Sequence, residues 1–164
     1  DDAIQEVVNY FKTAIATRQF VFGDRQSKRF KSRDETITRL IHVEMLPLIE
    51  HATGKKLKPT YTYLSCYVKG SDLPPHTDQV DCEITVSFVI DKPDNTNWPI
   101  YIHKHKQPIK HKGRYPSRPD IKDCIECDCD AGSIMIFDGT DHIHFRESLP
   151  YDYYNIILLH YKYT

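Results

Sequence analysis

PPHTD at 74–78 and EITVSFVI at 83–90 are the two neighbouring stretches that decide the fold of this chain. Apolar and polar residues alternate in the second stretch, which is typical of a β-strand with one buried face. On extended backbone, residues i and i+2 project to the same side. His76 and Asp78 can therefore face one metal ion from a short piece of chain.

The rest of the chain predicts helices first and strands afterwards. Apolar residues recur with helical spacing in the first part, and β-branched and aromatic residues alternate from about residue 58 onward. This order favours an α+β domain in which two N-terminal helices accompany a sandwich or jelly roll. The predicted helices are 1–16 and 34–52, and the further strands are 60–68, 98–102, 124–129, 133–137 and 152–163.

Local signals predict where the second helix begins and where it ends. Ser32 or Asp34 can cap the second helix, and Gly54 can end it. The basic segment 25–33 has few apolar residues and indicates an exposed loop. We expect one domain over residues 1–164, with helical support in 1–54 and a β core in 58–163.

The amino-acid composition excludes some classes of protein and leaves others open. The chain is 40% hydrophobic and 27% charged, which is ordinary for a globular protein, and its net charge of -1 does not indicate a polyanionic partner. No apolar run approaches the roughly 20 residues that span a bilayer. Five cysteines is an odd number in a chain large enough to need no disulfides, which favours free thiols and a cytoplasmic location.

A third metal ligand is expected in GTDHIHFR at 139–146, which follows another apolar run. Its two histidines, His142 and His144, are both candidates. Two neutral imidazoles and one carboxylate, with other coordination positions open, form the facial triad of non-haem Fe(II) oxygenases. A lone His-x-Asp pair is usually a solvated loop. However, Asp78 and His144 lie 66 positions apart, and several strands within that span can bring them together.

Four elements in order resemble the Fe(II)/2-oxoglutarate-dependent dioxygenase superfamily: YVKG at 67–70, HTD at 76–78, GSIMIFDG at 132–139 and HFRE at 144–147. The resemblance covers about residues 58–163 and is greatest to the prolyl-hydroxylase-like branch. It implies a double-stranded β-helix, or jelly roll, braced by the two helices. It also implies Fe(II), 2-oxoglutarate as co-substrate and O2. The family spacing favours His144 over His142 as the third ligand.

The far carboxylate of 2-oxoglutarate requires a buried basic partner, ideally an Arg that binds it with two hydrogen bonds. Relatives often place a basic residue at one of two adjacent positions in the last strand, which here are Tyr154 and Asn155. The chain departs from the family there, and Arg146 is the nearest replacement.

Two tyrosines can assist at that carboxylate. Tyr63 and Tyr67 lie in the strand before the His-x-Asp stretch, and Tyr67 matches the Tyr of the family's Tyr-x-x-Gly element. In the alternative interpretation, Arg146 forms only a structural ion pair with Glu147 or Asp141.

Asp78 also bears on the reaction. A related halogenase needs that coordination position free for a halide and usually has a small residue there. The resemblance therefore implies an enzyme that hydroxylates an unactivated C–H bond of a small molecule or peptide side chain, with release of succinate and CO2. A cupin-like hydrolase or isomerase with another metal is a further possibility.

A competing hypothesis is a non-enzymatic β-sandwich that binds nucleic acid or an acidic partner through the basic loop 103–119. The loop has six Lys or Arg, three His and no acid. Only Tyr115 offers an aromatic ring for base stacking, which makes nucleic acid the less favoured partner. In an enzyme, the same loop could cover an anionic substrate.

The cysteines of the segment 124–129 add one more possibility. Cys124, Cys127 and Cys129 could contribute to a zinc site. Strand-like alternation places Cys124 on the opposite side from the other two, so partly buried thiols in a strand are the simpler interpretation.

Overall fold

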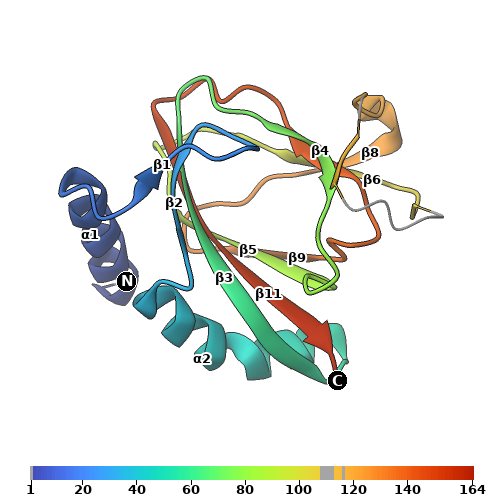
Figure 1. Ribbon diagram of the computed structural model, residues 1–164, viewed down its shortest axis with the longest axis horizontal. Helices are drawn as coiled ribbons and strands as arrows, with labels where there is room; N and C mark the ends of the chain where they lie inside the picture. Colours follow the sequence, from blue (N-terminus) through green and yellow to red (C-terminus); the bar gives the residue numbers. More distant parts are fainter. Residues whose placement is uncertain (1, 108–112, 116) are drawn as a thin grey trace.

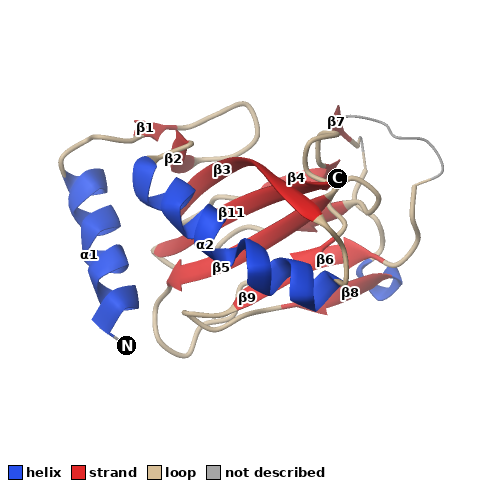
Figure 2. Ribbon diagram, turned by 90° about the horizontal axis from the view of Figure 1, so that it is seen from below, coloured by secondary structure: helices blue, strands red, loops and turns tan. Residues whose placement is uncertain are grey.

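The computed structural model describes residues 2–107, 113–115 and 117–164. Two antiparallel sheets face each other, and two helices cover the outer side of the larger sheet (Figures 1 and 2). The predicted α+β jelly roll with two N-terminal helices is confirmed. No described helix has both the length and the apolar character needed to span a membrane.

Both helices lie close to their predicted positions. Helix α1 spans Asp2–Ala16, and α2 spans Thr36–Thr53. The cap of α2 is Glu35, whose carboxylate accepts from the Thr38 N–H, so the prediction of Ser32 or Asp34 was wrong. Asp34 instead accepts from the Thr62 N–H and ties the helix start to the sheet. Gly54 ends α2 in the left-handed conformation, as expected.

Among the described residues, the larger sheet has six strands and the smaller sheet has five. Every pairing is antiparallel, as in a jelly roll. The larger sheet contains, in spatial order, β1 (Val21–Phe22), β2 (Arg29–Arg33), β3 (Leu57–Val68), β11 (Tyr153–Tyr163), β5 (Ile84–Asp91) and β9 (Ile134–Phe137). The smaller sheet contains β7 (Gly113–Arg114), β4 (Leu73–Thr77), β10 (His144–Arg146), β6 (Ile100–His103) and β8 (Cys124–Cys127), which follows the short 3-10 helix Ile121–Asp123.

Successive side chains along each strand project to opposite sides, so the larger sheet has two different faces. In β11, the side chains of Ile157, Leu159 and Tyr161 pack in the main core with the two helices. Their neighbours Ile156 and Leu158 project to the other side and line a cavity between the sheets. The helices therefore cover one face of the sheet, and the second face is free to build a site.

The prediction of an exposed loop over 25–33 was wrong for residues 29–33, and only residues 25–28 form a loop. Residues 29–33 form β2, which pairs with β3 in the larger sheet. Arg29, Lys31 and Arg33 project from one side of β2 into the cavity, and Arg29 is only 4% exposed. Phe30 projects from the other side and packs against the main core. The region 1–54 therefore supplies sheet and cavity wall as well as helices.

The cysteines and the basic loop give no support to the competing binding module. All five cysteines are free thiols, and the described residues contain no cluster of potential metal ligands that includes Cys124, Cys127 or Cys129. Residues 108–112 and 116 of the loop lie outside the described residues. In the described part, Lys106 pairs with Asp141 at 2.9 Å, and Arg118 lies 3.6 Å from Glu147. Binding of a partner by this loop stays a prediction, as does the cytoplasmic location.

Candidate active site

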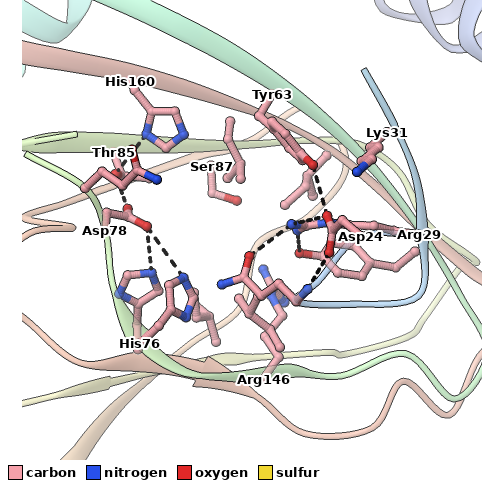
Figure 3. A pocket seen from close by; sticks show the side chains of 18 of the residues that line it. Asp24, Arg29, Lys31, Tyr63, His76, Asp78, Thr85, Ser87, Arg146 and His160 are labelled. Atoms are coloured by element: carbon pink, nitrogen blue, oxygen red, sulfur yellow. Dashed lines mark hydrogen bonds and ion pairs between the residues drawn. The ribbon is translucent and has the colours of Figure 1, made fainter. Parts of the chain in front are cut away.

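A cavity of about 950 Å³ lies between the two sheets. This volume is at the upper end of the range of roughly 300–1,000 Å³ for small-molecule sites. Four of the predicted residues, namely His76, Asp78, His144 and Arg146, line the cavity together with Tyr63 and Tyr67. Figure 3 shows His76, Asp78, Arg146 and Tyr63 around this space. Residues from both ends of the chain therefore meet in one space.

Strand register brings His76 and His144 together. These residues are direct partners in the antiparallel pair of β4 and β10, and their ring centroids lie 4.2 Å apart. Asp78 follows β4, and its Oδ1 lies 3.5 Å from the Nε2 atom of each histidine. One ligand atom from each of the three residues lies within 4.8 Å of the others, so the three could hold one ion.

Backbone contacts orient both imidazoles toward the common centre. The Nδ1 of His76 lies 2.8 Å from the Pro74 carbonyl oxygen, and the Nδ1 of His144 lies 3.0 Å from that of His142. A carbonyl accepts, so each Nδ1 carries the hydrogen and each Nε2 presents a lone pair. This is the arrangement of a metal-binding histidine whose second nitrogen is held by the protein.

His142 lies outside this cluster. Its Nδ1 contacts the carbonyl oxygen of His103, and it does not line the cavity. The structure therefore distinguishes the two candidate histidines by position, and His144 is the one beside His76 and Asp78.

The second carboxylate oxygen of Asp78 has partners of its own. Thr85 Oγ1 donates to Asp78 Oδ2 at 2.7 Å, and His160 Nδ1 lies 3.2 Å from the same hydroxyl. Thr85 and His160 are direct partners across β5 and β11, which fixes this contact. Gly139 packs against the other side of the Asp78 carboxylate. Its carbonyl oxygen accepts from the Asp78 N–H, and a Cβ added at Gly139 would lie 2.2 Å from Oδ2. These contacts leave Oδ1 facing the two imidazoles.

The electrostatics of this cluster suit a cation. Burial lowers the pKa of His76, and the neighbouring His144 lowers it further, so the His76 ring stays neutral. Burial alone would raise the pKa of Asp78, but His144 and His76 hold it well below its ordinary value. Burial lowers the pKa of His160 to about 4. The site thus combines an ionised carboxylate with a histidine, His76, whose neutral form is favoured.

A second group of potential ligands shares Asp78. Asp78, Cys82 and His160 also lie within 4.8 Å of one another. Burial raises the pKa of Cys82 to about 12, and its sulfur lies 3.0 Å from the Tyr61 hydroxyl. Because metals bind the thiolate, a thiol that stays protonated near neutral pH is a poor ligand. The pair of histidines with Asp78 is the better donor set.

Arg146 lies at another part of the cavity wall with an uncommitted charge. It is 2% exposed, and its guanidinium lies 4.6 Å from the Trp98 ring centroid and 5.0 Å from that of Tyr154. Its Nη1 donates to the Trp98 carbonyl. No ion pair joins Arg146 to Glu147 or Asp141, or to any other carboxylate among the described residues. Ser87, which also lines the cavity, has a buried hydroxyl without a hydrogen-bond partner.

A second buried arginine is neutralised locally. Both Nε and Nη2 of Arg29 lie 2.9 Å from Asp24 Oδ2, and its Nη1 donates to the Tyr67 hydroxyl at 2.7 Å. Tyr63 donates its hydroxyl hydrogen to Asp24. The hydroxyl hydrogen of Tyr67 therefore remains available to a ligand, whereas that of Tyr63 is already used.

Sequence reasoning missed several residues of the site. Arg29 was placed in an exposed loop, although the alternation of 29–33 was a usable strand signal, and Asp24 was given no role. Thr85 and Gly139 contact Asp78 only because of the way the strands pair, which no local pattern reports.

Comparisons with known proteins report a structural likeness. No family model and no curated protein sequence matches the chain. A prolyl-4-hydroxylase from Pseudomonas putida superposes with a TM-score of 0.69 at 10% identity, over 99% of this chain and 87% of that chain. The non-haem alpha-ketoglutarate-dependent carbocyclase SnoK from nogalamycin biosynthesis superposes with a TM-score of 0.71 at 10% identity, over 98% of this chain and 75% of that chain.

HygX from Streptomyces hygroscopicus was solved with nickel and 2-oxoglutarate bound. It superposes with a TM-score of 0.63 at 10% identity, over 96% of this chain and 78% of that chain. Identities this low establish architecture and leave the reaction open. The chain therefore has the jelly-roll fold that is also found in these 2-oxoglutarate-dependent enzymes.

Proposed function

We propose that this chain is an Fe(II)/2-oxoglutarate-dependent oxygenase, with His76, Asp78 and His144 as the metal ligands. The observation that supports this most is the buried cluster of two Nε2 lone pairs and one carboxylate oxygen, which lies beside an open cavity. Two histidines and one carboxylate with open positions are typical of non-haem Fe(II) oxygenases. Iron bound there would supply the activation of O2 that is coupled to oxidation of 2-oxoglutarate.

Arg146 is the proposed partner of the far carboxylate of 2-oxoglutarate. It lies two residues after His144 on β10, so its Cα is about 6.5 Å further along the strand. Its guanidinium lies over the ring of Tyr154, one of the two positions where relatives often have their basic residue. The cation would thus reach the same region from a different strand. The hydroxyls of Tyr67 and Ser87 could donate to the same carboxylate.

The remaining task of the protein is to exclude water and place the target bond. Leu73, Ile100 and Phe137 line the cavity and supply an apolar wall, and the Phe137 ring centroid lies 4.9 Å from that of His144. We propose hydroxylation of a C–H bond as the outcome, because Asp78 occupies the coordination position that a halogenase would need for a halide. An epimerase and a carbocyclase are among the structural neighbours, so the reaction outcome requires its own test.

Metal and co-substrate binding tests the proposal first. Calorimetry without oxygen should show that one Fe(II) or Zn(II) binds, and that 2-oxoglutarate then binds only to the metal-loaded protein. His76→Ala should abolish both events. His142→Ala is the matched control, because this histidine lies outside the cluster, and it should bind both ligands normally.

Turnover provides the second test. The wild-type protein with Fe(II), 2-oxoglutarate and O2 should release succinate, slowly without a primary substrate and faster with one. Asp78→Ala should release none. Wild-type succinate formation in a folded His76→Ala or Asp78→Ala protein would refute the assignment.

A further inference from the structure

The cavity contains more positive charge than the proposed co-substrate needs, and this excess lies on β2 and at the exposed Arg25 in the loop before it. Arg29, Lys31 and Arg33 alternate along the strand and all line the cavity. Exposure rises along the strand from buried Arg29, through half-buried Lys31, to exposed Arg33. The three cations therefore run from the interior of the cavity to its outer part.

The partners of these cations differ. Arg29 is bound to Asp24 through two nitrogens, so that pair is neutral. Arg33 lies 3.6 Å from Asp34, but Asp34 also accepts from Arg39 and from a backbone N–H, so its charge is shared. The side chain of Lys31 makes no ion pair and no hydrogen bond among the described residues, although its backbone pairs in the sheet.

The charges near the proposed metal already balance without β2. Fe(II) and Arg146 together carry three positive charges, and Asp78 and 2-oxoglutarate together carry three negative charges. Lys31 and the incompletely paired Arg33 are then left without a counter-charge in the cavity wall. A half-buried cation is stabilised by an anion close to it, so a ligand that fills this cavity should supply one.

Lys31 also lies at a suitable place for a substrate. Figure 3 shows Lys31 beside Tyr63, on the opposite side of the cavity from His76 and Asp78. Further out, the Arg33 guanidinium lies 4.0 Å from the centroid of the Tyr61 ring, which holds this flexible side chain over a flat surface. A molecule that spans the cavity could place a reactive C–H near the triad and an acidic group near β2.

We propose that Lys31, with Arg33 beside it, binds an anionic group of the primary substrate, either a phosphate or a carboxylate. This inference rests on the proposed oxygenase function and names the substrate class for that site. It assigns anion recognition to β2 rather than to the basic loop 103–119, in which Lys106 and Arg118 have acidic partners and Lys104 donates to the Lys122 carbonyl oxygen.

Binding of simple aromatic probes tests this inference. The protein is first loaded with Zn(II), which is redox-inert, and with 2-oxoglutarate, so that the triad and Arg146 are occupied. It is then titrated in a calorimeter with phenyl phosphate, benzoate and uncharged benzyl alcohol. We expect one or both anions to bind at least about tenfold more tightly than the alcohol, because a hydrogen bond to a charged group is worth that much.

Variants locate the site. Lys31→Met keeps the apolar stem and should remove most of this preference, whereas Lys31→Arg should retain it. Lys28→Met is the matched control, since this exposed lysine precedes the same strand but does not line the cavity, and its affinities should stay within about twofold of wild type. Preference for phenyl phosphate alone would assign a phosphate, and preference for benzoate alone would assign a carboxylate.

Three results would overturn the inference: equal affinity for all three probes, equal losses in Lys28→Met and Lys31→Met, or loss in Arg146→Met with none in Lys31→Met. Zinc and 2-oxoglutarate binding is measured first in the same samples, so a failure of the oxygenase proposal is seen separately. In that case the phenyl phosphate titration is repeated on the metal-free protein, where an effect of Lys31→Met still decides whether the anion site exists.

Discussion

Replacement of Gly139 by alanine should damage the proposed metal site without removing any ligand. Gly139 does not have a positive φ, so its backbone does not require glycine. The requirement comes from space: a Cβ there would lie 2.2 Å from Asp78 Oδ2 and 2.4 Å from Thr85 Oγ1. Ordinary contacts at a Cβ begin near 3.4 Å, so the carboxylate oxygen would have to retreat by about 1.2 Å.

Such a displacement is several times larger than a metal site tolerates, because ligand distances are held to within about 0.2 Å. The Asp78 carboxylate cannot simply rotate away, since its Oδ2 accepts from Thr85 and its backbone N–H donates to Gly139. Loss of a residue that orients a metal ligand typically weakens binding by about 10- to 100-fold. We expect Gly139→Ala to fall in this range, which corresponds to about 1.4–2.7 kcal/mol.

The assay is a competition titration of Zn(II) against a chromophoric chelator, with wild type and Gly139→Ala compared at one pH. Gly70→Ala is a suitable control, because nothing lies within 4 Å of a Cβ there although φ is +78°. That variant should lose about 1–2 kcal/mol of folding stability from backbone strain and keep its zinc affinity. A folded Gly139→Ala protein whose zinc affinity lies within twofold of wild type would refute the reasoning.

Three further predictions concern single side chains. Thr85→Val removes the hydroxyl that holds Asp78 Oδ2 and should weaken zinc binding by about tenfold in the same titration, with the protein still folded by circular dichroism. Arg146→Met should raise the Kd of 2-oxoglutarate at least about tenfold by calorimetry and leave zinc affinity unchanged; an unaltered Kd would exclude Arg146 as the carboxylate partner. Burial lowers the pKa of His42 to about 4, so below pH 6.5 the unfolded chain takes up a proton that the folded chain refuses, and stability falls as the pH falls from 6.5 toward 4. At pH 5.5 this costs about 1.4 kcal/mol, and His160, whose pKa burial also lowers to about 4, adds a similar loss. The stability lost between pH 7.5 and 5.5, measured by urea unfolding, should therefore be smaller by about 1.4 kcal/mol in His42→Leu than in wild type or in the exposed-site control His51→Gln.

The sequence could predict most of the fold because most of its signals are local. Helical spacing identified both helices, and period-two alternation identified the central strands. The placement of His76 and Asp78 on one side of an extended segment also needs only strand geometry. That these residues approach His144 followed from the resemblance, and the structure shows the physical cause, which is direct pairing of His76 with His144 across β4 and β10.

The remaining parts of the site depend on pairing that no local pattern specifies. Strand β2 was missed because its cavity face has Arg29, Lys31 and Arg33, so charge concealed an alternation that apolar residues would have made obvious. The contact of Thr85 with His160 arises from the register of β5 against β11. The need for glycine at 139 arises from two side chains of other segments, which only a three-dimensional arrangement can bring there.

The position of β2 has a consequence for how the chain can be shortened. Removal of residues 1–54 would leave residues 63–67 of β3 unpaired on the side that faces β2, and would expose a row of unpaired backbone groups there. Such an edge invites association with other chains, whereas the intact sheet ends in β1, which has only two residues. The same deletion would open one side of the cavity to solvent. A stable truncated form should therefore begin before Val21, even though the residues that resemble an oxygenase start much later.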